Sequence, residues 1–210
     1  MAHVTLTKQR LSLVLAPLLL LPLADFLAVA PMGSRIPLLF APLVVLPALL
    51  AALFIIMNLS ALLFRPFRSK MLPLVLLSAL YLGSVVAGMR TGRSIRMEAF
   101  TRLDKRSQPL VKAIKDYEHD KGAPPMSLEA LIPEYLRMVP STGMSGYPAY
   151  RYLSGESARH FAGNPWVLIV DTPRSALNWD QFMYFPQQNY PGSGYGGVLR
   201  RVGDWAYLNE

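Results

Sequence analysis

Three long apolar runs in the first half of the chain constrain its fold more than any other feature. Residues 11–32 are apolar apart from Ser12 and Asp25, whereas residues 36–64 and 71–89 contain no charged side chain. An α-helix rises about 1.5 Å per residue, so about 20 residues cross the hydrocarbon core of a bilayer. The runs therefore predict three membrane-spanning helices, over residues 11–32, 36–64 and 71–89, with very short connections between them.

The charge distribution agrees with a membrane protein. Charged residues make up 16% of the chain and hydrophobic residues 52%, whereas soluble domains are about one quarter charged. Residues 1–96 hold nine basic residues and one acid, and residues 97–210 hold twelve of each. The net charge of +8 therefore flanks the apolar runs, where basic residues anchor spans. Nucleic acid is not an expected partner.

The first apolar run could be a retained membrane span or a signal peptide, and its one acid, Asp25, could lie near the lipid headgroups or form a functional site. Ala28-Val29-Ala30 fits a signal-peptide cleavage site, but Pro31 follows directly and the run is long, which favours a retained span. Asp25 is the only acid in the three runs, and an intramembrane acid is a candidate functional group. Because Asp25 lies toward one end of its run, we favour a position near the lipid headgroups over a proton or ion site.

Residues 97–210 have the pattern of an α+β domain that begins with a helix. Side chains on one helix face recur every three or four residues: Phe100, Leu103, Ser107, Leu110, Val111, Ile114 and Tyr117. Pro109 is expected to kink this helix or to lie in the first turn of a second one.

Aromatic and β-branched segments that are candidate strands follow the helix. They lie at residues 147–153, which alternate only in part, 166–170, 179–185, 198–202 and 205–208. Gly203-Asp204 fits a type II′ hairpin turn between the last two. The predicted fold is thus an α+β membrane protein. About three N-terminal transmembrane helices precede a long helix that packs on a small antiparallel sheet of three or four strands.

A series of short segments in the same half carries a resemblance to a known family. Ala113-Ile114 and Tyr117 lie on the helix, and the segments after it are Asp120-Lys121-Gly122-Ala123-Pro124, Ser127-Leu128-Glu129-Ala130-Leu131-Ile132-Pro133, Tyr135-Leu136, Val139-Pro140 and Tyr150-Arg151-Tyr152. In this order they resemble the soluble part of type IV pilin-like proteins, especially the major pseudopilins of type II secretion systems. In that family a membrane helix continues into the soluble helix, which matches residues 70–152 here.

The chain departs from that family before the shared segments. Lys70-Met71-Leu72-Pro73-Leu74-Val75 has neither the glycine cleavage point nor the helix glutamate of a prepilin, and two further apolar runs precede it. The resemblance therefore implies a pilin-like domain, residues 97–210, on a multi-pass anchor, residues 1–96, rather than a pilus subunit.

The charges alone do not orient the spans. With the N-terminus inside, five basic residues flank the spans on the cytoplasmic side, and the opposite orientation places four there. The resemblance implies an extracytoplasmic domain. We therefore expect a bacterial cytoplasmic (inner) membrane protein with a cytoplasmic N-terminus.

The candidate binding residues are aromatic or acidic. Thirteen of the 22 aromatic residues follow residue 146, and strand alternation would bury many of them. The candidates for a partner or ligand surface are Trp179, Tyr184, Tyr190, Tyr195 and Trp205. Some pseudopilins hold calcium near C-terminal loops, which makes Asp171, Asp180 and Asp204 the acids to consider here, although no ligand loop pattern is present.

No catalytic residue, cofactor or other metal site is predicted, because the sequence lacks cysteine, a G-x-S-x-G elbow and a phosphate-binding loop. Our first hypothesis is a non-enzymatic membrane protein whose pilin-like domain contacts envelope or secretion-assembly proteins. The alternatives are a membrane-anchored glycan- or peptide-binding module and, less favoured, an enzyme or transporter subunit that uses Asp25.

Overall fold

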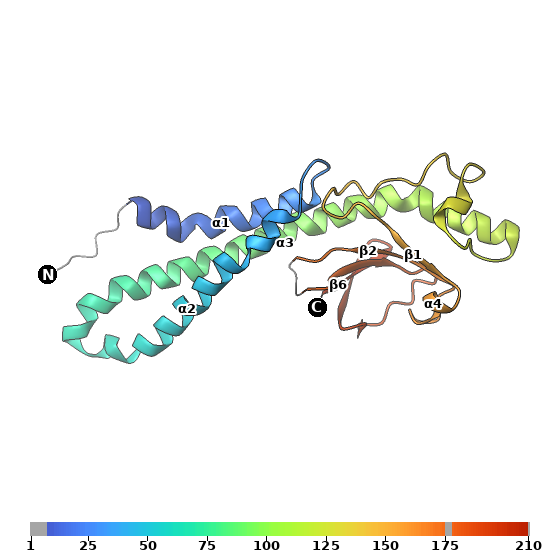
Figure 1. Cartoon of the computed structure of the whole chain (residues 1–210). Coiled ribbons are helices and arrows are strands. Elements are labelled where there is room, and N and C mark those ends of the chain that lie inside the picture. The colour runs from blue at the N-terminus through green and yellow to red at the C-terminus, as the bar shows by residue number, and fades with distance from the viewer. Residues whose placement is uncertain (1–7, 175–177, 210) are drawn as a thin grey trace. The chain divides into compact units, whose positions relative to one another are not determined.

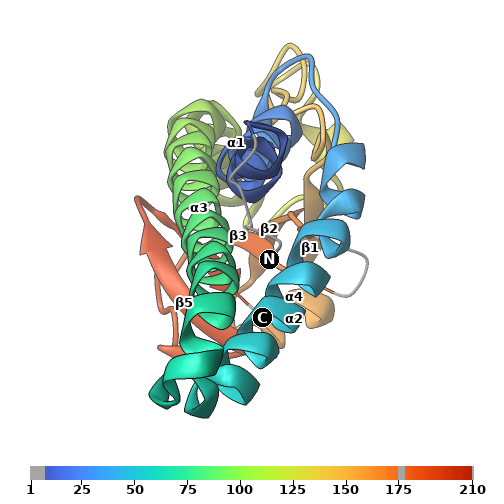
Figure 2. The same ribbon diagram turned by 90° about the vertical axis from the view of Figure 1, so that its left-hand side faces the viewer.

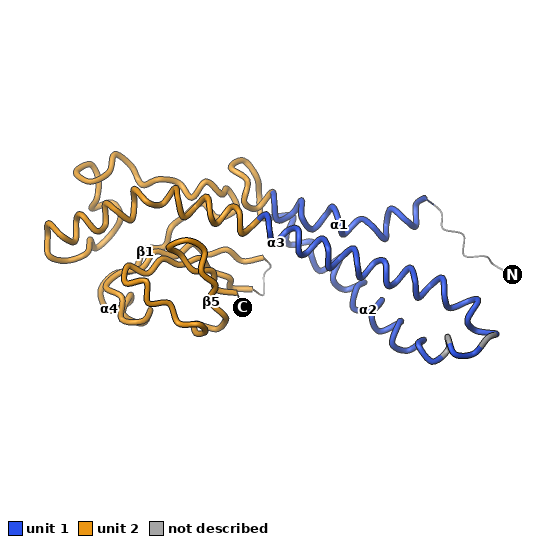
Figure 3. Tube along the Cα trace, turned by 180° about the vertical axis from the view of Figure 1, so that it is seen from behind, with its two compact units in different colours: residues 1–26, 36–95 blue, residues 27–35, 96–210 orange. Residues whose placement is uncertain are grey.

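A computed structural model describes residues 8–174 and 178–209. It contains two compact units (Figure 3). Unit 1 comprises Met1–Phe26 and Ile36–Ile95, and unit 2 comprises Leu27–Arg35 and Arg96–Glu210. The short segment between the first two apolar runs therefore belongs to the same unit as the C-terminal half of the chain.

The N-terminal half is helical (Figure 1). Its elements are α1 (Lys8–Val29), the 3-10 turn η1 (Ile36–Phe40), α2 (Pro42–Asn58), η2 (Ser60–Leu63) and α3 (Arg65–Lys121). Three helical regions, Lys8–Val29, Ile36–Asn58 and Pro66–Lys121, are long and apolar enough to cross a membrane by length and composition. The prediction of three candidate spans is confirmed at this level.

The helices differ from the predicted runs at their ends. The second run is divided into η1, α2 and η2, with Pro42 in the first turn of α2, where its missing N–H costs nothing. Residues 65–70 were expected to form a connection, but they already belong to α3. Pro109 also lies inside α3. The carbonyl that its ring leaves without an N–H partner belongs to Lys105, an exposed residue that water can reach.

Small residues on α3 bring it close to α1 within unit 1. The Ser84 hydroxyl donates a hydrogen bond to the Val14 carbonyl at 2.7 Å. A Cβ atom on Gly88 would lie only 2.4 Å from the carbonyl oxygen of Pro17. Helices in a membrane associate through such close backbone contacts because lipid offers no hydrophobic driving force between them.

Helix α2 contacts the rest of unit 1 over a small part of its surface. The Tyr81 hydroxyl donates to the Val44 carbonyl at 2.8 Å, and Ala48 packs in a small cluster with Leu21 and Val85. Only 6% of the most apolar 18-residue stretch of Ile36–Asn58 is buried. Its exposed leucine, isoleucine and phenylalanine side chains are suited to lipid rather than to water.

Unit 2 combines the C-terminal half of α3 with a sheet (Figure 2). The strands are β1 (Arg151–Ser154), β2 (Trp166–Asp171), β3 (Gln181–Tyr184), β4 (Ser193–Gly194), β5 (Gly197–Val202) and β6 (Trp205–Asn209), with η3 (Leu128–Leu131) and the single-turn helix α4 (Glu156–Arg159) between α3 and β2. They form one antiparallel sheet in the order β1-β2-β3-β6-β5-β4. The predicted α+β class is confirmed, whereas the expected three or four strands are corrected to six.

The predicted turn between β5 and β6 is present. Gly203 has φ of 62°, and Asp204 is not among the described residues with positive φ. Positive φ at the first central position alone is the type II′ pattern, which requires glycine there. This turn sets the register in which Val202 pairs with Trp205.

The face of α3 that the sequence marked as apolar is the one that the sheet covers. Phe100, Leu103, Leu110 and Ile114 are completely buried. The Phe100 ring stacks on Phe182 of β3 at 4.7 Å between centroids. One part of the core of unit 2 therefore lies between α3 and the sheet. A second buried cluster is formed by alternate strand residues together with α4: Ala158, Val167, Ile169, Met183, Phe185 and Leu208.

Two tryptophan side chains also tie the sheet to this helix by hydrogen bonds. The indole N–H of Trp205 donates to the Ser107 hydroxyl, and that of Trp166 donates to a Glu118 carboxylate oxygen, both at 3.0 Å. A buried indole N–H needs such an acceptor. The two bonds lie eleven residues apart on α3, which is about 16 Å along the helix.

Candidate functional site

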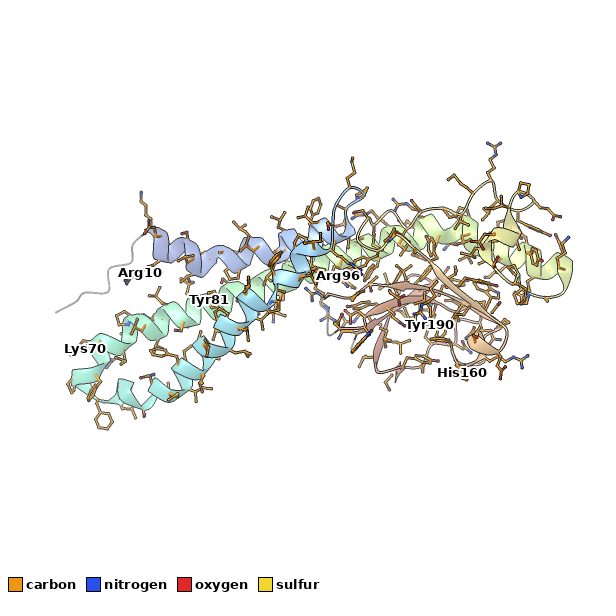
Figure 4. All side chains as sticks on the ribbon, in the orientation of Figure 1. Arg10, Lys70, Tyr81, Arg96, His160 and Tyr190 are labelled. Carbon is orange, nitrogen blue, oxygen red and sulfur yellow. The ribbon has the colours of Figure 1, made fainter. Side chains whose placement is uncertain are left out.

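A buried polar cluster is centred on Arg96, the first α3 residue of unit 2 (Figure 4). The Arg96 side chain is 1% exposed. Its guanidinium donates to the Tyr147 hydroxyl at 2.9 Å and to the Thr172 carbonyl at 2.8 Å. A buried guanidinium must be paired and hydrogen-bonded to offset the loss of hydration, and these contacts supply part of that requirement.

Asp180 provides the opposite charge in the cluster. One Asp180 carboxylate oxygen lies 3.9 Å from an Arg96 guanidinium nitrogen, and both side chains are buried. The same carboxylate accepts hydrogen bonds from the Asn178 amide at 2.8 Å and from the Tyr207 hydroxyl. Burial, with a further contribution from the Asp180 carboxylate, raises the pKa of Tyr207 to about 12. Tyr207 is therefore a neutral donor at physiological pH.

The cluster holds residues 172–173 and Asp180 against α3. The Thr172 N–H donates to the Asp180 carbonyl at 2.8 Å, and the Tyr147 hydroxyl donates to the Pro173 carbonyl at 3.0 Å. Arg96 bonds to both Tyr147 and Thr172. The arrangement orders the chain where the sheet meets the helix.

This cluster was not predicted from the sequence. Arg96 was expected to be one of the basic residues that flank the spans, and Asp180 one of the acids to consider for calcium. The available signal was the helical spacing, because Arg96 precedes Phe100 by four residues and therefore shares the buried face. Nothing in the sequence indicated that Asp180 would be its partner.

The five aromatic residues predicted to form a surface do not share one environment. Tyr184 and Trp205 are 2% and 0% exposed and lie in the core, so they are not surface residues. Tyr190 and Tyr195 are partly buried, and the Tyr190 ring stacks on Phe185 at 4.6 Å. Trp179 alone among the five is largely exposed, at 66%.

Tyr190 has a structural role that its hydroxyl explains. The hydroxyl accepts the Phe185 N–H at 2.8 Å and donates to the Asp204 carbonyl at 2.7 Å. The Arg201 guanidinium lies 4.6 Å from the centre of its ring. Burial raises the pKa of Tyr190 well above its ordinary value, so its hydroxyl remains a donor at physiological pH.

Asp25 is buried inside unit 1. Its side chain is 1% exposed. A Cβ atom on Gly92 would lie 2.1 Å from its carboxylate oxygen, so the carboxylate occupies the space above that glycine. Gly92 follows the third apolar run by only three residues. Asp25 therefore packs against the first turn of α3 after that run.

The three acids considered for calcium lie in different settings. Asp171 is exposed and binds Arg151 at 2.8 Å, while Asp180 belongs to the Arg96 cluster. Asp204 accepts a 3.4 Å hydrogen bond from Gln108. Among the described residues, no group of three or more His, Cys, Asp or Glu side chains is placed to hold a metal ion.

Comparisons of the chain with protein-family models, with curated proteins and with solved structures found no match.

Proposed function

We propose that this chain is a non-enzymatic membrane protein whose pilin-like domain contacts other proteins of a bacterial envelope or secretion assembly. The observation that carries the proposal is helix α3, which is apolar over residues 71–89 and continues without a break into the core of unit 2. A membrane helix that becomes the spine of an α+β domain, with an antiparallel sheet packed on its second half, is the arrangement of pilin-like proteins.

Contacts of the loop between the first two runs support a three-span topology. The Ser145 N–H and hydroxyl both bond to the Ala30 carbonyl, at 3.1 and 2.8 Å, and the Gly146 N–H bonds to that of Ala28 at 3.2 Å. Unit 2 therefore contains both the end of the first apolar run and Arg96, the residue seven positions after the third apolar run. Three crossings put these two points on one side of the membrane and the N-terminus on the other.

The same contacts favour a retained first span. Ala28 and Ala30, which the alternative treats as a cleavage site, are bonded to the segment at 145–146 and Ala28 is completely buried. Cleavage after Ala30 would separate these contacts from the rest of the first helix. The proposed location is a bacterial cytoplasmic membrane, with a cytoplasmic N-terminus and an extracytoplasmic unit 2.

A pair of cysteine variants tests the location, because the chain has no cysteine of its own. Ser193→Cys lies in β4 of unit 2 and Ser69→Cys near the start of α3, and both positions are exposed. In intact cells a membrane-impermeant maleimide should label Ser193→Cys and should label Ser69→Cys only after lysis. The reverse pattern would overturn the extracytoplasmic assignment.

Photo-crosslinking in the same cells tests the protein contact. A photoreactive residue at Met138, which is 72% exposed in unit 2, should give a discrete adduct with an envelope-assembly protein. The same residue at Ser69 is the control for non-specific capture on the opposite side. If neither Met138 nor other exposed positions of unit 2 yield an adduct absent from the control, the domain does not act through protein contacts.

A further inference from the structure

One outer edge of the sheet in unit 2 is only partly covered. β4 is the last strand at this edge, and its two residues pair only with Gly197 and Val198 of β5. No described strand pairs with residues 199–202 of β5 on the side away from β6. Figure 2 shows β5 at the margin of the sheet. A strand edge of this kind can accept a further strand from another chain.

The register of the β5–β6 hairpin shows which backbone groups face outward. In a hairpin with a two-residue turn, the residues that flank the turn, here Val202 and Trp205, exchange hydrogen bonds. Bonded and non-bonded pairs alternate along an antiparallel ladder, so Leu199 and Arg201 direct their N–H and C=O groups away from β6. The Leu199 N–H agrees with this direction, because it donates to the Gly192 carbonyl at 3.3 Å. The Leu199 C=O and both backbone groups of Arg201 therefore face the open edge.

Two arginine side chains flank these groups, one on each face of the sheet. Arg200 lies opposite Tyr207, whose ring is 5.3 Å from that of Phe100 on α3, so Arg200 is on the helix side of the sheet. Arg201 is on the other face, because side chains alternate along a strand. Both arginine side chains are exposed. A strand added at this edge would thus meet a positive charge on each of its faces.

The Arg201 guanidinium is held in place although it is exposed. It donates to the Gln188 side-chain oxygen at 2.7 Å and to the Gly203 carbonyl at 3.3 Å. It also lies 4.6 Å from the centre of the Tyr190 ring. None of these partners is an anion. Within residues 8–174 and 178–209, neither Arg201 nor Arg200 forms an ion pair.

The charge of this edge decides which occupant fits it. At the opposite edge of the sheet, Arg151 of β1 already binds the Asp171 carboxylate at 2.8 Å. A second copy of the chain at β5 would bring Arg200 and Arg201 of the two copies together, and like charges across a strand pair are destabilising. A strand with acidic residues has the complementary charge. Because the two arginines are consecutive, the two acids must also be consecutive, one for each face.

We propose that the open edge of β5 binds an extended segment of a partner protein that carries two consecutive acidic residues. Backbone N–H groups of the segment donate to the Leu199 and Arg201 carbonyls, and one of its carbonyls accepts the Arg201 N–H. Its two carboxylates bind Arg200 and Arg201. Val198, which is 62% exposed and on the same face as Arg200, adds an apolar contact. Strand addition is a common mode of peptide recognition. The inference rests on the protein contact of the proposed function and gives the chemistry of the partner.

Peptide binding to the full-length protein in mild detergent tests the inference. The probe is a short fluorescent peptide of alternating threonine and valine with two consecutive glutamates at its centre, and the control peptide has two lysines instead. At low ionic strength, fluorescence anisotropy should show binding of the glutamate peptide about tenfold tighter or more, since two exposed charge pairs change sign.

Charge reversal in the protein provides matched variants. Arg200→Glu/Arg201→Glu should reverse the preference and bind the lysine peptide more tightly. Arg137→Glu/Arg159→Glu changes two other exposed arginines of unit 2 by the same charge and should keep the wild-type preference. Equal affinity of the wild-type protein for the two peptides would overturn the inference, and so would the absence of binding.

Hydrogen exchange separates strand pairing from simple charge attraction. The glutamate peptide should slow the exchange of the Arg201 amide, which faces the open edge, whereas attachment through charge alone would leave this rate unchanged. An unchanged rate at saturating glutamate peptide would therefore refute strand addition. An Arg201 amide that exchanges more slowly as the protein concentration rises, without peptide, would assign the edge to a second copy of the chain instead.

The outcome is separable from that of the proposed function. Crosslinking at Met138 in cells reports whether a protein partner exists, and peptide binding in detergent does not depend on the side of the membrane. A crosslinked partner without any preference between the peptides would retain the protein contact and reject the β5 edge. Binding of the glutamate peptide without an adduct in cells would retain the β5 edge and reject the envelope contact.

Discussion

Replacing Arg96 by methionine should destabilise unit 2 strongly. The guanidinium is buried and bonded to Tyr147 and Thr172, and its positive charge lies 3.9 Å from Asp180. Methionine fills much of the same volume but supplies neither the donors nor the charge. The substitution leaves the Thr172 carbonyl without its side-chain donor and the buried Asp180 carboxylate without its cation.

The magnitude follows from what Asp180 retains. Removing one partner of a buried ion pair costs about 3–5 kcal/mol. Asp180 keeps hydrogen bonds from Asn178 and Tyr207, and its separation from Arg96 is at the outer limit of an ion pair. We therefore expect the lower end of that range, about 3 kcal/mol. Removing both charges in Arg96→Met/Asp180→Asn should cost less than the sum of the single substitutions, with a coupling of about 0.5–3 kcal/mol.

Urea unfolding in mild detergent measures this loss. All three tryptophans lie in unit 2, so their emission reports this unit and not unit 1. With m of about 1–3 kcal/mol per molar urea, the expected loss moves the midpoint down by roughly 1–3 M. Arg96→Lys, which keeps the charge without the planar fork, should fall between wild type and Arg96→Met. An Arg96→Met protein within about 0.5 kcal/mol of wild type, as for a surface substitution, would refute the reasoning.

Two further predictions concern helix packing and pH. Gly92→Leu should separate α1 from α3, because a Cβ at this position would lie 2.1 Å from the Asp25 carboxylate. The separation is measured as the yield of the disulfide between Val14→Cys and Ser84→Cys. This yield should fall severalfold in Gly92→Leu relative to the control Gly83→Leu, whose Cβ meets nothing within 4 Å. Burial, with the charge of Asp204, raises the pKa of Asp104. The folded state therefore binds this proton more tightly, and its stability relative to Asp104→Asn should rise as pH falls from neutral toward the ordinary aspartate pKa. Urea midpoints that keep a constant difference across this range would contradict that sign.

Helical periodicity and charge-free length predicted the parts of the fold that depend on local pattern. The buried face of α3 was predicted from the spacing of Phe100, Leu103 and Ile114, and each is completely buried. The apolar run at 166–170 was predicted to form a strand, and β2 (Trp166–Asp171) covers it. These features could be predicted because the spacing of apolar side chains within a single segment is enough to indicate them.

Features that depend on pairing between distant segments were not predictable in this way. Arg96 and Asp180 are 84 residues apart in the sequence. Each is a charged residue that would be expected at the surface if its partner were not known. The contact of Ser145 with Ala30 likewise joins segments 115 residues apart. Trp179 and Trp205 are both aromatic residues in or beside predicted strands, yet one is exposed and the other is in the core. Strand register and the path of the connecting segment decide that difference.

The central position of β6 bears on how unit 2 is made in the cell. β6 is the last described strand, yet it lies between β3 and β5 and pairs with both. During synthesis from the N-terminus, an edge of β3 stays unpaired until residues 205–209 have been made. An open edge can pair with other chains. Unit 2 therefore completes its sheet only with its last described strand, and the β3 edge is open to wrong pairing until then.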